Sequence, residues 1–323
     1  MGGYAGLMRI VWAAIACASA LAAQSTQETT RTTSVDVNGN RVWDGAEFTQ
    51  IKTPNGSETV EKLKSINGGM VQAQRVEEHV IRNDSSEKII ERVVRNYDQN
   101  GDPLPPVKTL IDEHKQPNGS STVETTTSSA DVNGNTHVIE RTRTDNRVSG
   151  ATTTTNTVVE RPTLNGGFGT VEKSTTVTDK RANGFSSAET VYREDPNGGF
   201  YTAVRRTTDH TENGSQSTDN SAEYEVGPTG ALELHGQTIT HTAKRADGSE
   251  AVQVDIYRKN VPGVSNDTGA LKLQEQQDIT RKPGPGNSMV ETVNVRRPSI
   301  SDPNSLGPER QLSQTTCQGN CKN

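Results

Sequence analysis

The acidic and amide residues between positions 36 and 47 form the pattern in this sequence that is closest to a metal site. Five oxygen-bearing side chains fall at positions 1, 3, 5, 9 and 12 of an EF-hand-like calcium loop: Asp36, Asn38, Asn40, Asp44 and Glu47. Position 6 is Arg41 instead of the Gly that the sharp turn needs, and the sister segment from Asp131 has Thr142 where the last acid should stand. We therefore favour turn capping by Asp and Asn side chains, and we predict no metal site.

The histidines and carboxylates show no spacing that is typical of catalysis. The six histidines are His79, His114, His137, His210, His235 and His241. His235 and His241 would share one face of a strand but would lie about 20 Å apart, too far to bind one ion. Adjacent acids such as Asp112 and Glu113 would point to opposite faces, and no His-Glu-x-x-His or Gly-x-Ser-x-Gly motif occurs. We predict no catalytic residue, no cofactor and no enzymatic activity.

The composition limits the classes of protein that this chain can form. Only 29% of the 323 residues are hydrophobic and 4% are aromatic, which argues against a compact core of the size usual for this length. The formal net charge of −6 argues against a nucleic-acid partner.

The first residues predict export. Arg9 precedes the apolar stretch from Ile10 to Ala16, and Ala20-Leu21-Ala22 fits a cleavage site, so we assign residues 1–23 to a signal peptide. The expected location is secreted, extracellular or periplasmic, with a lipid anchor at Cys17 as the minor alternative. An oxidising compartment would also permit a small terminal disulfide loop between Cys317 and Cys321.

Turn dipeptides such as Asn-Gly and Asp-Gly recur about every 16 residues from Gly39 to Gly248. They alternate between a set followed mostly by Ser, as at Gly119-Ser120, and a set followed by Gly, Asn or a bulkier residue, as at Gly198-Gly199-Phe200. The stretches between them are rich in Thr, Val, Ile and Tyr, which favour strands. The repeating unit is therefore one hairpin of about 32 residues, with its two kinds of turn at opposite edges of a meander.

The predicted fold is all-β: tandem hairpins of about 32 residues in a long antiparallel meander sheet that is elongated and either curled or solenoid-like. We expect a flexible segment at 24–34, hairpin repeats at 35–262, an irregular linker at 263–286, a last strand at 287–297 and a disordered tail at 298–323. An outer-membrane barrel is disfavoured, because the Thr-rich stretch at 152–157 offers neither lipid-facing alternation nor aromatic girdles. The mature chain is therefore expected to have no membrane span.

Three functional hypotheses follow from this organisation. The first is a non-catalytic structural or surface protein of the cell envelope that associates with itself through exposed sheet edges. The alternative is an extracellular binding module that recognises a glycan or protein along its strand face or its rows of turns. The third is a hydrolase whose site is assembled from distant repeats.

Overall fold

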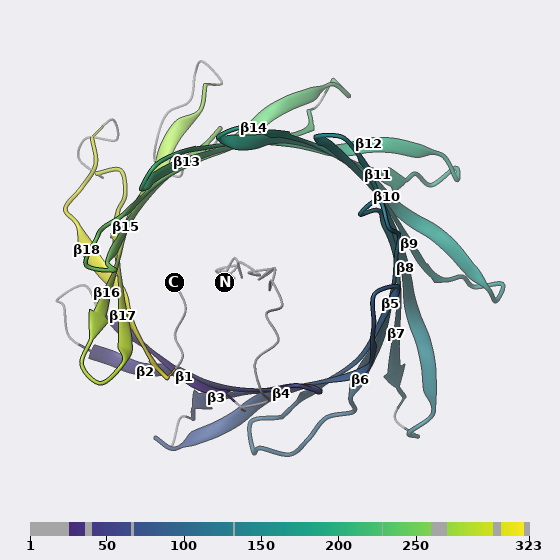
Figure 1. The fold of residues 1–323 in the computed structure, drawn as a ribbon, viewed down its shortest axis with the longest axis horizontal. Helices are drawn as coiled ribbons and strands as arrows, with labels where there is room; N and C mark the ends of the chain where they lie inside the picture. The colour runs from purple at the N-terminus through teal and green to yellow at the C-terminus, as the bar shows by residue number, and fades with distance from the viewer. Residues whose placement is uncertain are drawn as a thin grey trace.

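In the computed structural model the chain forms one closed antiparallel barrel of 18 strands (Figure 1). The structure describes residues 26–35, 41–65, 68–131, 133–227, 229–259, 270–299 and 305–319. The predicted signal peptide, the side chain of Cys17 and the segment Asp36–Asn40 therefore lie outside the described residues.

Consecutive strands pair as hairpins around the whole ring. The strands are β1 (Thr26–Val35), β2 (Arg41–Thr53), β3 (Gly56–Lys64), β4 (Met70–Asn83), β5 (Glu87–Asn96), β6 (Val107–Lys115), β7 (Ser121–Ala130), β8 (Thr136–Ser149), β9 (Thr152–Pro162), β10 (Phe168–Arg181), β11 (Gly184–Glu194), β12 (Phe200–Asn213), β13 (Gln216–Val226), β14 (Leu232–Lys244), β15 (Glu250–Arg258), β16 (Lys272–Gly284), β17 (Ser288–Arg296) and β18 (Arg310–Gly319). The predicted all-β hairpin meander is confirmed.

The prediction of an open sheet is wrong, because the two ends of the chain pair with each other. β1 pairs with β2 on one side and with β18 on the other, where Thr30 is in register with Cys317. The segment predicted to be flexible at 24–34 therefore contributes β1, and the tail predicted to be disordered at 298–323 contributes β18. Among the described strands no edge is left unpaired, so the expected self-association through sheet edges lacks the edges it needs.

The linker predicted at 263–286 is also corrected, since β16 occupies most of it. β16 pairs with β15 and β17 over most of its length. Pro283 is the last residue but one of this strand, next to the hairpin turn, where a missing N–H costs the ladder little. The strand predicted at 287–297 agrees with β17.

The barrel has two rims that differ in their turns. At the terminal rim β1 begins and β18 ends, and several turns contain only two residues, as between Arg181 and Gly184. At the flared rim the turns at 65–69, 98–102, 131–135, 163–167, 195–199 and 227–231 are longer. Each is closed by a hydrogen bond from its first N–H to the carbonyl four residues later. The two predicted kinds of turn therefore do lie at opposite ends of the hairpins.

Figure 1 shows the hairpin ends of the flared rim spreading outward from the ring. A β-bulge lies just inside this rim in seven even-numbered strands, close to the start of each strand. The extra residues are Ala73, Ile139, Val171, Ala203, His235, Gln274 and Leu312. A bulge bends its strand, which accounts for the outward turn. From Ile139 to His235 the bulges recur at a constant interval that matches the hairpin repeat, so the sequence repeat is also a repeat of backbone geometry.

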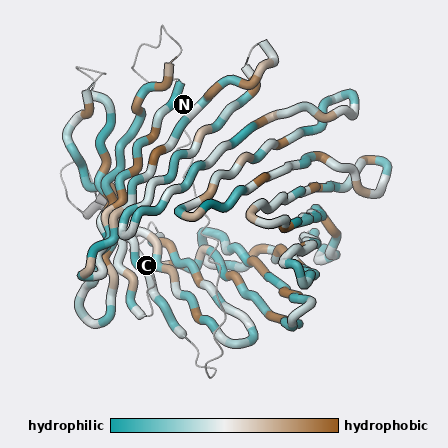
Figure 2. The backbone as a smooth tube through the Cα atoms, turned by 45° about the horizontal axis from the view of Figure 1, so that its top comes forward, coloured by the Kyte–Doolittle hydropathy of each residue, from teal (hydrophilic) through white to brown (hydrophobic). Residues whose placement is uncertain are grey.

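The wall is one sheet thick and holds almost no core. The only buried hydrophobic residues among those described are Val191, Ala203, Val204 and Val295. Hydrophobic positions are interspersed with hydrophilic ones along the strands (Figure 2). The ladders between neighbouring strands, not a packed interior, therefore hold the barrel together.

The two faces of the wall follow from strand alternation and register. We call face 1 the face that carries Asp112, His114 and Arg143, and face 2 the one that carries Ile111, Glu113 and Thr144. Face 2 bears cross-strand hydroxyl pairs, such as Thr144 with Thr157 at 3.1 Å and Thr208 with Ser221 at 3.1 Å. Such pairs stabilise the ladder and leave the surface polar.

Candidate functional site

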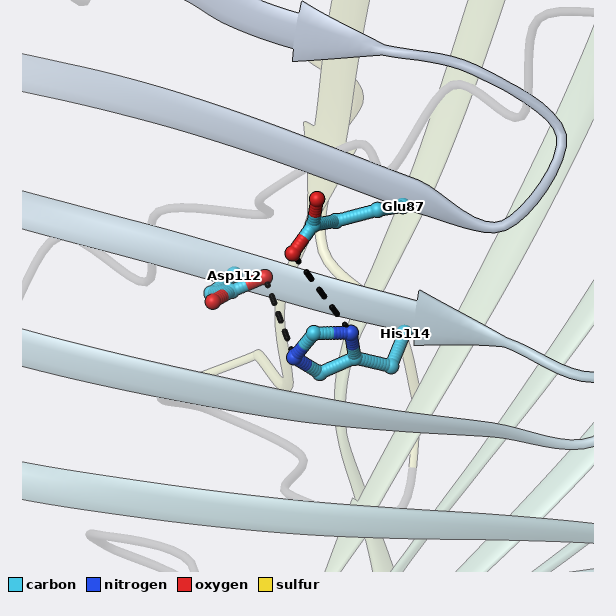
Figure 3. Close-up of side chains that lie close together, drawn as sticks. All are labelled: Glu87, Asp112 and His114. Carbon is cyan, nitrogen blue, oxygen red and sulfur yellow. Dashed lines mark ion pairs between the residues drawn. The ribbon is translucent and has the colours of Figure 1, made fainter.

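The barrel brings Glu87, Asp112 and His114 together on face 1 (Figure 3). Glu87 begins β5, and the antiparallel register places it opposite His114 near the end of β6. Asp112 lies two residues before His114, so strand alternation puts both side chains on the same face. Strand register thus brings one residue of β5 next to two residues of β6 near the terminal rim.

The imidazole of His114 lies between the two carboxylates. Its Nδ1 is 3.7 Å from Oε1 of Glu87, and its Nε2 is 3.5 Å from Oδ1 of Asp112. The side chain of His114 is 56% exposed, whereas that of Glu87 is 17% exposed. Each nitrogen therefore faces a different carboxylate.

Arg82 adds a positive charge to this cluster from β4. Its guanidinium forms ion pairs with Glu87 and with Asp84, the latter at 2.7 Å. The pKa of Asp84 is held well below its ordinary value, first by the backbone N–H of Ser86 and then by Arg82. Arg82 therefore competes with any cation for the carboxylate of Glu87.

The chemistry open to this cluster is limited. Its ligand atoms lie within 4.8 Å of one another, which is close enough for a divalent cation. One cation, however, can bind only one nitrogen of an imidazole, and here the two nitrogens face different carboxylates. The contacts present place an imidazole between two carboxylates, and the prediction of no metal site stays a prediction.

The sequence reasoning missed the proximity of Glu87 and His114, because it depends on the register of β5 and β6. The available signal was the Asp-x-His pattern at 112–114, since residues two apart share a strand face. The expectation that Asp112 and Glu113 point to opposite faces agrees with their register.

The other histidines are distributed around the ring. The side chain of His210 is more enclosed than those of His114 and His235: its Nδ1 is 2.7 Å from Oδ1 of Asp219, and its ring stacks on Phe185. His235 is the extra residue of a bulge and faces Glu225 at 3.5 Å, whereas His241 lies 3.1 Å from the hydroxyl of Thr218. His79 pairs in register with Glu91, and His137 with Ser129.

The calcium-like turns use their carboxylates to cap the backbone. Oδ1 of Asp131 accepts hydrogen bonds from the N–H groups of Asn133 and Asn135, both at 2.8 Å. Oδ1 of Asp98 accepts in the same way from Asn100 and Asp102. Turn capping is therefore confirmed in these two turns, while Asp36, Asn38 and Asn40 lie outside the described residues.

Cys317 on β18 is disulfide-bonded. The other two cysteines of the chain, Cys17 and Cys321, lie outside the described residues. The predicted loop between Cys317 and Cys321 therefore stays a prediction.

No family model matches this chain, and no curated protein matches it. The chain is similar to a solved structure described as a bacterial polysaccharide outer membrane secretin, at 8% identity and a TM-score of 0.36. The alignment covers 91% of this chain and 96% of that one. A likeness at this TM-score carries no argument about function. Among the described residues no helix is long and apolar enough to cross a membrane.

Proposed function

We propose that this protein is an exported, non-catalytic structural or surface barrel of the cell envelope, and that its wall is in contact with water on both faces. The observation that carries the proposal is the presence of ion pairs on both faces. Because neighbouring side chains on a strand alternate between the faces, this conclusion does not depend on which face lines the interior.

On face 1, Arg143 pairs with Glu124 at 3.0 Å, and both side chains are more than half exposed. On face 2, Arg206 lies between Glu189 at 3.0 Å and Glu223 at 2.8 Å. Charged groups of this kind are costly to remove from water. A continuous apolar belt on either face would have to bury them, so a solvated wall is the arrangement that these contacts favour.

The proposed role of such a wall is mechanical. Eighteen strands that are each paired on two sides resist separation cooperatively, although few side chains are buried. This replaces assembly through sheet edges as the structural mechanism, because the closed ring has none among the described strands. Export is supported by the sequence of residues 1–23.

Expression of the full chain in a bacterium tests this proposal. We expect mass spectrometry to find a mature N-terminus near Ala23 or Gln24, and electron microscopy to find dispersed ring-shaped particles without detergent. An intact N-terminus in the cytosol would overturn export. Particles that stay dispersed only in detergent would overturn the solvated wall.

A groove on face 1 favours a second candidate, the binding module for a glycan or protein. It has a volume of about 460 Å³ and runs across β10 to β14. Its lining includes hydroxyl, amide and carboxylate groups, among them Ser186, Asp209, Asn220 and Gln237, beside the ring of Tyr224. These groups suit hydrogen bonding to an extended polar chain. Retention on a polysaccharide array that is lost in Asp209→Ala would support this function.

A further inference from the structure

Exposed apolar side chains are concentrated at the flared rim. Of the thirteen large hydrophobic residues that are exposed among those described, ten lie in or next to the turns of this rim. They are Leu63, Met70, Leu104, Leu164, Phe200, Tyr201, Val226, Leu232, Leu234 and Leu312. At the terminal rim only Ile81 belongs to this set. Single exposed apolar residues are normal, but a set gathered at one end of a molecule indicates an interaction surface.

The sequence repeat places part of this set at equivalent positions. The first strand residue after a flared-rim turn is Met70 in β4, Phe200 in β12 and Leu232 in β14, and Phe168, which is half-buried and outside this set, holds the same place in β10. Phe168, Phe200 and Leu232 follow one another at the interval of the hairpin repeat, and each stands just before the bulge of its strand. The bulge that turns the hairpin outward thus also carries these side chains away from the wall.

Two of the aromatic rings at this rim carry a cation over their face. Cζ of Arg141 lies 4.1 Å from the centre of the Phe168 ring, and Nζ of Lys173 lies 4.1 Å from that of Phe200. An aromatic ring combined with a basic side chain is the pairing that suits a membrane interface, where the ring reaches the acyl boundary and the cation meets phosphate.

The shape of the flared rim favours a lipid surface over a protein as its partner. The hairpin ends are spread outward, so their apolar tips are separated from one another (Figure 1). Leu164 stands at such a tip with its whole side chain exposed. A rigid protein would need a separate matching pocket for each tip, whereas a fluid lipid surface accepts them individually.

We propose that the flared rim docks on a phospholipid surface, with its apolar residues inserted and Arg141 and Lys173 beside the phosphates. The barrel stands on the bilayer by this rim and does not cross it. This inference goes beyond the structural role proposed above and shares with it only the solvated wall.

Flotation of the full-length barrel with vesicles tests this docking. Vesicles of phosphatidylcholine mixed with phosphatidylglycerol should carry the protein upward, and sodium carbonate should release it. The variant Met70→Ser/Leu164→Ser/Phe200→Ser/Leu232→Ser should lose at least about tenfold in partitioning, because four apolar contacts are removed. The matched control Ile81→Ser/Leu110→Ser changes exposed apolar residues outside the flared rim and should float like the parent.

Each outcome of the flotation experiment either supports or overturns the proposed docking. Equal flotation of the four-site variant and the parent, or no flotation of the parent, would overturn the docking. Retention after carbonate would overturn both the docking, which does not cross the bilayer, and the solvated wall. Tryptophan fluorescence tests the docking even if the four-site variant fails to fold. The emission of Leu164→Trp should shift to the blue on vesicles, and that of Ile81→Trp should not. The opposite pattern would contradict the proposal.

Discussion

The two rims of the barrel are built from the same hairpin repeat but differ in how closely backbone atoms surround the glycines of their turns. At the terminal rim several turns contain only two residues, and in one of them the added Cβ of a residue replacing Gly184 would lie on the backbone carbonyl of His210. At the flared rim the corresponding Gly198 has nothing within 4 Å. The terminal-rim turns at Gly56 and Gly184, where a Cβ would meet backbone, thus constrain the register of their strands, whereas the flared-rim turn at Gly198 leaves its end free to form a surface. The difference explains why the turns alternate in sequence although the strands resemble one another.

Substitution of Gly184 is the most severe way to test this comparison. Gly184 has φ +145, and in Gly184→Ala the new Cβ would lie 1.9 Å from the carbonyl oxygen of His210. The ladder between β11 and β12 must shift, so the free energy of unfolding should fall by about 3 kcal/mol. Urea denaturation followed by circular dichroism measures this loss.

The matched control is Gly198→Ala at the flared rim. Its φ of +81 is also unfavourable for Ala, but no atom is displaced, so a loss of about 1 kcal/mol is expected. Equal losses in the two variants would mean that the terminal rim is not the more constrained one.

Ion pairs give a second contrast between the two rims, with a smaller expected effect on the free energy of unfolding. Near the terminal rim, Arg281 lies between Glu250 at 2.5 Å and Glu291 at 2.7 Å, and the side chain of Glu250 is only 9% exposed. Arg281→Met should cost about 2 kcal/mol, because it leaves a nearly buried carboxylate without this partner. The measurement is the free energy of unfolding in urea.

Arg193 at the flared rim provides the control for this prediction. Its pair with Glu172 at 3.2 Å is exposed on both sides, so Arg193→Met should cost less than about 0.5 kcal/mol. A larger loss in Arg193→Met than in Arg281→Met would contradict the proposed contrast between the rims.

The hairpin repeat could be predicted from the sequence because it depends on local chemistry. Asn-Gly turns, and the β-branched residues between them, determine each hairpin without reference to the rest of the chain. Closure could not be predicted, because it depends on the pairing of β1 with β18, whose partners come from opposite ends of the chain. The residues of these two strands carry no signal of this pairing, because the partner of each lies at the other end of the chain.

The candidate site was hidden for a similar reason. Glu87 and His114 face each other through the register of two strands joined by a long connection, which no motif records. The bulges were also not predicted: an extra residue such as Ala203 has no distinctive type, and only its equal spacing from Val171 and His235 marks it. The residue types and the period of the hairpin repeat could be read from the sequence. The contacts between strands could be found only once the register of those strands was known.

The smallest effect that we expect concerns His210, near the terminal rim. Burial of the imidazole opposes its charged form, but the hydrogen bond and charge of Asp219, aided by Glu212, outweigh burial and raise the pKa of His210 above its ordinary value. A raised pKa in the folded state means that the ion pair contributes fully below the pKa of the unfolded imidazole. The contribution is lost as the pH rises through the folded value. His210→Gln should therefore lower the free energy of unfolding by less than about 1 kcal/mol near pH 5.5, with almost no effect at pH 8.5.

The flared-rim control for this prediction is His235. Its Nδ1 is 3.5 Å from Glu225 and its side chain is 42% exposed, so His235→Gln should lower the free energy of unfolding less than His210→Gln does near pH 5.5. Unfolding curves at the two pH values measure both variants. A loss in His210→Gln at pH 8.5 as large as that at pH 5.5 would show that His210 stabilises the barrel by stacking on Phe185 and not by its charge.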